Sequence, residues 1–133
     1  MTEYAPGTPS WVELSAPDTD AAAAFYGGLF GWTFEDVMPG GSPVPYFTAR
    51  LPGGDVAAIS GQMPDAPRQP AAWNTYVWVD DADATAAKAR ELGGEVITGP
   101  LDAPWTRMAV IRDPQGATFV ASQFVLENKD LVA

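Results

Sequence analysis

The sequence contains no histidine and no cysteine. Without cysteine the chain can form neither disulfides nor thiolate metal sites, and without histidine it cannot build an imidazole site for zinc, nickel or iron. The same two absences exclude the Ser-His and Cys-His pairs of nucleophilic catalysis. Several large classes of hydrolase and metalloenzyme are therefore excluded before any motif is considered.

Basic residues are also scarce, because seven Lys and Arg stand against 17 Asp and Glu, a formal net charge of −10. The bases are scattered, whereas binding to a nucleic acid backbone requires a basic face, so we expect no nucleic acid partner. The acidic excess favours neutral or cationic small ligands. No apolar run approaches the ~20 residues of a membrane span, and the start "MTEYAPGTPS" is unlike a signal peptide. We therefore predict a cytoplasmic protein with no membrane partner.

The sequence does contain a repeat. With an offset of 63 residues, "DTDAAAAFYGGLFG" (18–31) matches "DADATAAKARELGG" (81–94) at seven of fourteen positions. Each stretch begins with acidic residues that suit a helix N-terminus and ends at glycine, which suits a helix C-terminus. We expect helices over about 20–30 and 82–92.

Side-chain spacing in the first helix predicts an apolar stripe of Ala21, Ala24, Phe25 and Leu29. The aromatic residues expected in the core are Phe25, Tyr26, Phe30, Phe34 and Phe119, and Trp32 is assigned to the core as well.

Strand patterns surround both helices in the same order. One strand precedes each helix, and three follow it, with turn signals in "LPGGD" and "DPQG". Proline-rich residues 63–72 read as an extended linker, and the last ten residues read as a polar tail. The sequence therefore predicts one domain over 1–133, composed of two β-α-β-β-β modules at about 8–62 and 73–125.

The segments "PDTDAAAAFYGGLFGW" and "RDPQGATF" resemble the vicinal oxygen chelate superfamily, the glyoxalase, bleomycin-resistance and extradiol dioxygenase group. The resemblance covers about residues 8–125. It implies an α+β fold in which two tandem β-α-β-β-β modules form a curved mixed-sheet cleft, and it implies a homodimer because the family often pairs chains. Enzymes of the family place a divalent metal in that cleft.

The resemblance assigns the four metal-ligand positions to Trp11, Ala58, Asn74 and Val120. Ligands at these positions in the family are His, Glu or Gln, so this chain departs from the metal-binding pattern and resembles a branch without metal. We expect no metal and no cofactor. The acidic segment 80–83 also fails as a calcium loop, because alanines occupy ligand positions, and it suits a helix N-terminus instead.

Alternation along the strands places Glu13 on the same face as Trp11, and Tyr76 and Trp78 on the same face as Asn74. Aromatic and neutral polar groups of this kind suit a flat, partly apolar ligand. The predicted ligand-binding residues are Trp11, Glu13, Ala58, Asn74, Tyr76, Trp78, Trp105, Met108 and Val120.

Three functions are compatible with these residues. The first is a metal-independent small-molecule-binding protein, similar to the bleomycin-resistance proteins, that sequesters a planar or aromatic ligand such as an antibiotic. The second is a metal-independent lyase or isomerase in which Glu13 is the general base. The third is a structural dimerisation domain with a closed cleft.

Overall fold

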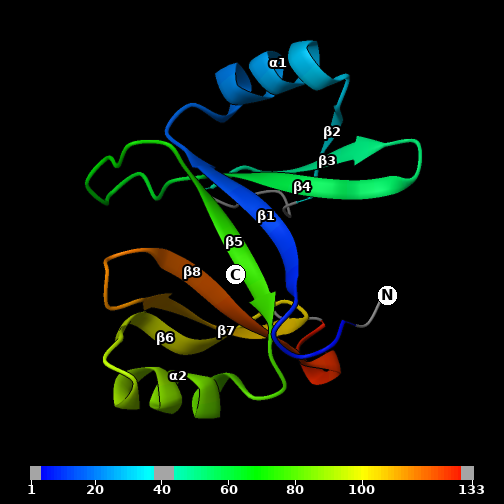
Figure 1. The fold of residues 1–133 in the computed structure, drawn as a ribbon. Helices are drawn as coiled ribbons and strands as arrows, with labels where there is room; N and C mark the ends of the chain where they lie inside the picture. Colours follow the sequence, from blue (N-terminus) through cyan, green and yellow to red (C-terminus); the bar gives the residue numbers. More distant parts are fainter. Residues whose placement is uncertain (1–3, 38–43, 130–133) are drawn as a thin grey trace. The chain divides into compact units, whose positions relative to one another are not determined.

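The computed structural model describes residues 4–37 and 44–129. The chain divides into two compact units. The α1 unit comprises Trp11–Asn74, and the α2 unit comprises the chain from Thr75 onward together with the N-terminal residues up to Ser10. The predicted β-α-β-β-β order is confirmed twice, and the fold is α+β with a mixed sheet (Figure 1).

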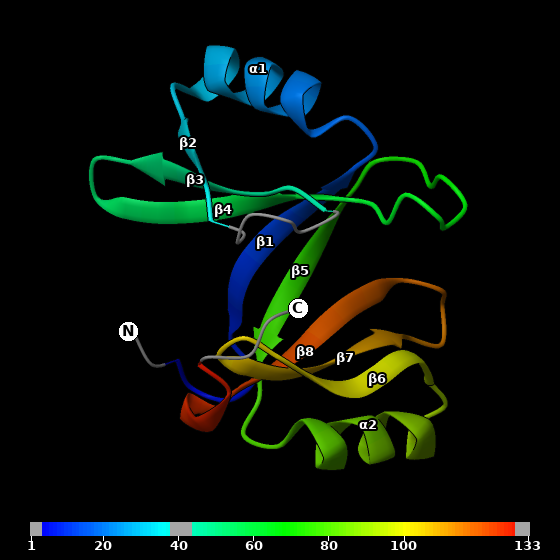
Figure 2. The ribbon, with the colours of Figure 1, turned by 180° about the vertical axis from the view of Figure 1, so that it is seen from behind.

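In the first half of the chain, the strand order is β2-β3-β4-β1, with β1 parallel to β4 and antiparallel pairs elsewhere. Helix α1 lies along one face of these strands (Figure 2). Leu14, Ala16 and Ile59 form the core beneath it. The elements are β1 (Pro9–Ala16), α1 (Thr19–Phe30), β2 (Thr33–Asp36), β3 (Tyr46–Leu51) and β4 (Gly54–Gly61).

The second half repeats this arrangement, with the order β5-β8-β7-β6 and β5 parallel to β8. Helix α2 packs through Ala86 on Ala109, Ile111 and Ala121 of the sheet. The N-terminal segment pairs with β5, since Gly7 N–H donates to the Trp78 carbonyl at 2.8 Å. The elements are β5 (Ala72–Trp78), α2 (Ala82–Glu91), β6 (Glu95–Ala103), β7 (Thr106–Arg112), β8 (Thr118–Phe124) and a 3₁₀ helix, Leu126–Asn128.

The repeated acids are helix caps. The Asp18 carboxylate accepts a hydrogen bond from Ala21 N–H, and the Asp81 carboxylate accepts one from Ala84 N–H, each at 3.0 Å. Both donors are themselves matched positions of the repeat. The repeat therefore preserves the hydrogen bonds that start the helices.

The predicted apolar stripe of α1 is wrong. Ala21, Ala24, Phe25 and Leu29 are exposed, and the helix packs on the core through Ala22, Ala23 and Tyr26. Phe25 and Phe30 were also expected in the core, but their side chains are 61% and 53% exposed. Periodicity failed because every residue from 21 to 30 is apolar or glycine, so spacing alone does not single out an inner face. Tyr26, Trp32, Phe34 and Phe119 are half-buried.

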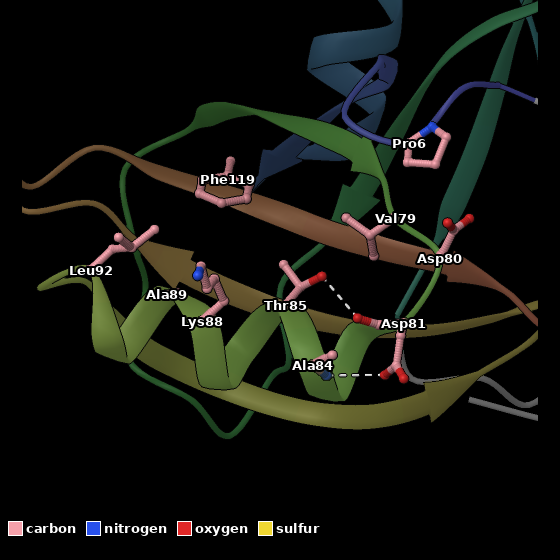
Figure 3. Close-up of a pocket in the computed structure, with 10 residues that line it drawn as sticks. All are labelled: Pro6, Val79, Asp80, Asp81, Ala84, Thr85, Lys88, Ala89, Leu92 and Phe119. Carbon is pink, nitrogen blue, oxygen red and sulfur yellow. Dashed lines mark hydrogen bonds between the residues drawn. The ribbon is translucent and has the colours of Figure 1, made fainter.

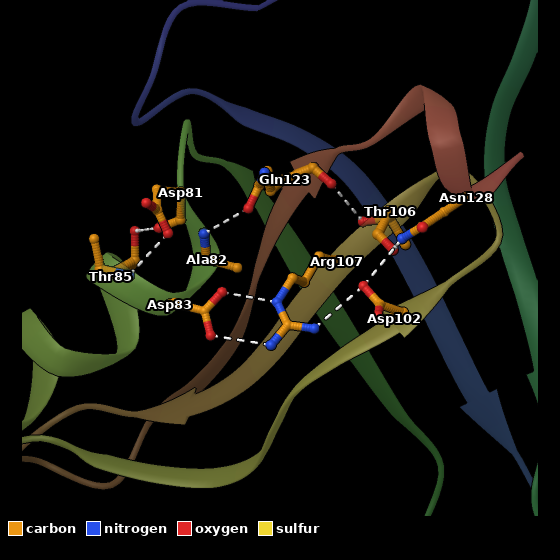
Figure 4. Close-up of polar contacts among 10 residues, drawn as sticks. Asp81, Ala82, Asp83, Thr85, Asp102, Thr106, Arg107, Gln123 and Asn128 are labelled. Carbon is orange, nitrogen blue, oxygen red and sulfur yellow. Dashed lines mark hydrogen bonds and ion pairs between the residues drawn. The ribbon is translucent and has the colours of Figure 1, made fainter.

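Arg107 joins three parts of the α2 unit (Figure 4). Its guanidinium donates to both carboxylate oxygens of Asp83, at 2.7 and 3.0 Å, and lies 3.2 Å from an oxygen of Asp102. Asn128 in turn donates to Asp102 at 3.1 Å and to the Thr106 carbonyl at 2.9 Å. The predicted polar tail therefore has a structural role up to Asn128, and residues 130–133 lie outside the described residues.

The hydrogen bonds from Arg107 hold the pKa of the Asp83 carboxyl below its usual value of 3.8. A carboxyl whose pKa is lowered by folding contributes stability above its unfolded pKa, and that contribution disappears as the pH falls through the folded pKa. We expect Arg107→Met to lower the melting temperature at pH 7 and the deficit to shrink below about pH 3.8. Thermal unfolding of both proteins from pH 7 to pH 2.5 tests this, and a deficit that stays constant would contradict it.

Candidate functional site

Each sheet has one face packed on its helix and one face opposite. In the α2 unit the face opposite α2 is formed by three cross-strand rows. Tyr76 pairs with Val120, which pairs with Val110, and Trp78 pairs with Ser122, which pairs with Met108. The third row joins Phe124 to Thr106. Four predicted ligand-binding residues, Tyr76, Trp78, Met108 and Val120, are therefore neighbours.

Aromatic rings form a continuous series on this face. The rings of Trp78 and Phe124 are 6.2 Å apart with 14° between their planes, and those of Phe124 and Trp105 are 6.1 Å apart with 13° between their planes. Tyr4 adds a fourth ring, 5.5 Å from Trp78. The three rings are nearly parallel, and neighbouring rings stack on one another. Such an arrangement can stack against a planar ligand.

Trp105 is held at the end of the series by an unusual backbone. Its φ of 65° lies in the left-handed region, which is costly for a bulky side chain. Two backbone bonds fix it, since Trp105 N–H donates to the Asn128 carbonyl at 3.2 Å and Val125 N–H donates to the Trp105 carbonyl at 2.9 Å. The indole is 44% exposed. The two backbone hydrogen bonds thus hold an exposed indole at the end of the series.

A polar pair lies beside these rings. The hydroxyls of Thr106 and Ser122 are 2.8 Å apart, and Thr106 also donates to the Gln123 carbonyl. Because the Thr106 hydrogen goes to the Gln123 carbonyl, Ser122 donates to Thr106, and the pair offers lone pairs to a ligand that donates hydrogen bonds.

In the α1 unit, the face opposite α1 carries the predicted carboxylate. Glu13 pairs with Ala58, which pairs with Thr48, and Ser15 pairs with Ser60, which pairs with Tyr46. The Tyr46 hydroxyl donates to Glu13 Oε2 at 2.7 Å, and both side chains are half-buried. A short charge-assisted bond of this kind orients the carboxylate.

The remaining predicted residues have less defined surroundings. Trp11 lies on β1 two residues before Glu13, and Asn74 lies in β5; both are half-buried. Sequence analysis missed four residues that contact the predicted ones, namely Tyr4, Tyr46, Thr48 and Phe124. Tyr46 and Thr48 could not have been found by counting outward from the "LPGGD" turn, because the register of β3 on β4 shifts between Ala49 and Arg50.

The four positions that the family uses for metal do not fit a metal here. Ala58 and Val120 are buried hydrocarbon side chains, at 0% and 5% exposure, and Trp11 offers an indole N–H that can only donate. Asn74 alone supplies an oxygen. Within residues 4–37 and 44–129, no group of three or more Asp and Glu side chains is arranged to hold a metal ion either. We therefore derive no chemistry through a metal.

An open hollow of about 600 Å³ lies elsewhere, beside α2 (Figure 3). It runs along α2 between Pro6 and Phe119, and it contains none of the predicted ligand-binding residues. Two of its polar groups already serve the helix, since Asp81 caps α2 and Thr85 donates to the Asp81 carbonyl at 2.8 Å. We therefore place the candidate site on the aromatic and carboxylate faces rather than here.

Comparison with known proteins agrees with this fold. The family model for the Glyoxalase/Bleomycin resistance protein/Dioxygenase superfamily matches residues 8–120. The chain belongs to this superfamily. Among the helices that the structure describes, none has the length and apolar character to cross a membrane.

Two curated members of the superfamily show clear sequence similarity. The "Putative glyoxylase CFP32" of Mycobacterium tuberculosis is 46% identical over 119 residues, covering 87% of this chain and 45% of that protein. The "Anthracycline biosynthesis protein DnrV" of Streptomyces peucetius is 42% identical over 132 residues, covering 90% of this chain and 48% of that protein. The chain thus spans about half the length of these relatives.

Solved structures of the superfamily are similar in fold. A methylmalonyl-CoA epimerase from Mycobacterium tuberculosis superposes with a TM-score of 0.67 at 14% identity, over 96% of this chain and 95% of the epimerase. An epimerase in complex with methylmalonyl-CoA gives a TM-score of 0.63 at 15% identity, over 92% and 97% of the two chains. At this identity the likeness shows the fold alone.

Proposed function

We propose that this chain binds a planar, partly apolar small molecule without a metal and sequesters it, as an antibiotic-binding protein of the cytoplasm. The observation that carries the proposal is the series of near-parallel rings Trp78, Phe124 and Trp105 on the face opposite α2. The proposed ligand contacts lie on the face opposite α2, which carries Tyr76, Trp78, Met108 and Val120. Stacking on such rings supplies binding energy without a covalent or metal-mediated step.

The net charge of the chain and the name of one relative limit the class of ligand that we propose. The net charge of −10 favours a neutral or cationic molecule. One relative is named for anthracycline biosynthesis. Anthracyclines combine a fused planar ring system with a cationic amino sugar, so they match both the aromatic series and the charge. We therefore propose an anthracycline-like polycyclic aromatic as the ligand class.

A second candidate function is a metal-independent lyase or isomerase. The observation that favours it is the 2.7 Å hydrogen bond from Tyr46 to Glu13. A carboxylate held by a phenol hydroxyl can accept a proton from a carbon acid, and the phenol can stabilise the charge that develops on the substrate. In this reading Glu13 is the base and Tyr46 its partner.

Analysis of the small molecule after incubation with the chain distinguishes the binding function from the enzymatic one. The chain is incubated with an anthracycline glycoside, and the small molecule is extracted and analysed by mass spectrometry and proton exchange in D₂O. For the binding function we expect the ligand to return unchanged, with no deuterium at carbon. Turnover or exchange that is lost in Glu13→Gln would instead establish the second function. Absence of both binding and turnover would contradict both.

A further inference from the structure

The hydroxyl groups of Thr106 and Ser122 have both of their hydrogens committed inside the fold. Thr106 Oγ1 lies 3.1 Å from the Gln123 carbonyl oxygen, which can only accept, and 2.8 Å from Ser122 Oγ. The one hydrogen of Thr106 therefore goes to Gln123, and the hydrogen of Ser122 goes to Thr106. Within residues 4–37 and 44–129, no other group donates to either oxygen. Ser122 thus keeps two lone pairs for a ligand and Thr106 keeps one, but neither keeps a hydrogen.

The surroundings of Thr106 maintain this direction of donation. The Thr106 carbonyl accepts a hydrogen bond from Asn128 Nδ2 at 2.9 Å (Figure 4). The Gln123 side chain accepts one from the Ala82 N–H at the start of α2, also at 2.9 Å. Both residues of the Thr106–Gln123 hydrogen bond are therefore anchored to other elements. Turning the Thr106 hydrogen toward a ligand would break this bond without gaining a new partner for the Gln123 carbonyl.

The pair lies among the aromatic and apolar side chains of the face opposite α2. Ser122 pairs with Trp78 of β5 on one side and with Met108 of β7 on the other. Thr106 pairs with Phe124. Both hydroxyl-bearing side chains are half-buried, so water competes only in part for their lone pairs. A planar ligand on this face can therefore present the edge of its ring to Ser122 Oγ.

A donor and an acceptor at the ring edge have different consequences at Ser122. A donor binds a lone pair and breaks no existing hydrogen bond. An acceptor must first take the Ser122 hydrogen away from Thr106, so it gains one hydrogen bond and loses another. A phenolic hydroxyl therefore gains binding energy at this position, whereas an ether oxygen or a quinone carbonyl gains none.

We propose that Ser122 makes this face selective for planar ligands that carry a hydrogen-bond donor at the ring edge, such as a phenolic hydroxyl, over the matching methyl ether. Ser122 is the residue that contacts the ligand. Thr106 is a positioning residue, because it holds the Ser122 hydrogen away from the ligand. The inference rests on the proposed function, since it names the ligand chemistry that the binding face would select.

Fluorescence titration of the full chain with 1-hydroxypyrene and 1-methoxypyrene tests the selectivity. The two probes share one planar ring system, and only the first carries a donor hydrogen. We expect 1-hydroxypyrene to bind about tenfold more tightly, as one net hydrogen bond provides. Unsubstituted pyrene should bind like 1-methoxypyrene, which would show that the methyl group is not merely too large for the face.

Two substitutions distinguish the contacting residue from the positioning residue. Ser122→Ala removes the acceptor, so it should weaken binding of 1-hydroxypyrene about tenfold and leave the Kd of 1-methoxypyrene within about twofold. Thr106→Val keeps the volume of the side chain and frees the Ser122 hydrogen, so it should strengthen binding of 1-methoxypyrene. A purely structural role of Thr106 would not produce that gain.

Thr118→Ala is the matched control, because Thr118 lies on the same face of β8 but is exposed and pairs with Arg112. It should leave the Kd of both probes unchanged, and circular dichroism checks that every variant is folded. Equal binding of the two probes by the wild-type chain would overturn the selectivity and leave the stacking site in place. Ser122→Ala that weakens both probes equally would also overturn it. Absence of binding by every probe overturns it too, whereas saturable binding of an anthracycline glycoside would still support the proposed function.

Discussion

Gly99→Ala is expected to lower the free energy of unfolding by roughly 3 kcal/mol or more. Gly99 has a φ of +85°, in the region that side chains avoid, and a Cβ atom there would lie 2.7 Å from the Met108 carbonyl oxygen and 3.0 Å from the Leu101 amide nitrogen. Both neighbours are backbone atoms of the β6–β7 pair, so neither can rotate away. Alanine would push β6 away from β7, the strand that carries Met108.

Gly116→Ala distinguishes the two causes of this destabilisation, which are the positive φ and the steric clash of the Cβ atom. Gly116 has a comparable φ of +97°, but a Cβ atom there would meet nothing within 4 Å. Its substitution should therefore cost only the conformational part, about 1–2 kcal/mol. Urea unfolding of both variants measures the difference. Equal destabilisation by the two substitutions would show that the close approach at Gly99 is unimportant.

Trp78→Ala is expected to weaken binding of an anthracycline glycoside about 10- to 100-fold, or ~1.4–2.7 kcal/mol. Trp78 is an inner ring of the series, in contact with both Tyr4 and Phe124. Its removal deletes one stacking surface and leaves Phe124 without its support on one side. Calorimetric titration of the folded variant gives the change in Kd.

Trp73→Ala is the matched control for that titration. Trp73 lies on the same strand, β5, but its indole donates to the Tyr26 hydroxyl of α1 at 3.3 Å and stands edge-on to that ring at 5.3 Å. Its loss should reduce stability and leave the Kd unchanged. If Trp73→Ala weakened binding as much as Trp78→Ala, the ligand would not be bound on the face opposite α2.

Much of the fold could be predicted because its signals are local. Helix caps at Asp18 and Asp81 and the turn that Asp113 and Gly116 form depend on hydrogen bonds between near neighbours in the sequence. Such bonds depend on short stretches of sequence, so they can be predicted without knowledge of the tertiary fold. The element order followed from them.

The orientation of α1 could not be predicted for the opposite reason. Which side of a helix packs inward is normally read from polar residues on the outer side. Between residues 21 and 30 there are none, and the outward position of Phe25 and Phe30 is decided by which small side chains, Ala22 and Ala23, fit against Leu14 and Ile59. That choice depends on packing between elements distant in sequence.

The candidate site was predictable strand by strand but not across strands. Alternation grouped Tyr76 with Trp78, but only the cross-strand register places Val120 beside Tyr76, and Met108 in the same row as Trp78. Phe124 and Tyr46 were missed because their proximity to Trp78 and Glu13 arises only when strands pair. The left-handed backbone of Trp105 has no sequence signal, because such a conformation favours glycine.

The most direct test of metal-independent binding is the titration of an anthracycline glycoside into chain that has been treated with EDTA and dialysed. The account predicts saturable binding with one ligand per chain, an unchanged Kd when Mg²⁺, Zn²⁺ or Ni²⁺ is restored, and weakening by Trp78→Ala. Binding that appears only after a metal is added would contradict it, and would mean that side chains outside the four family positions hold a metal after all.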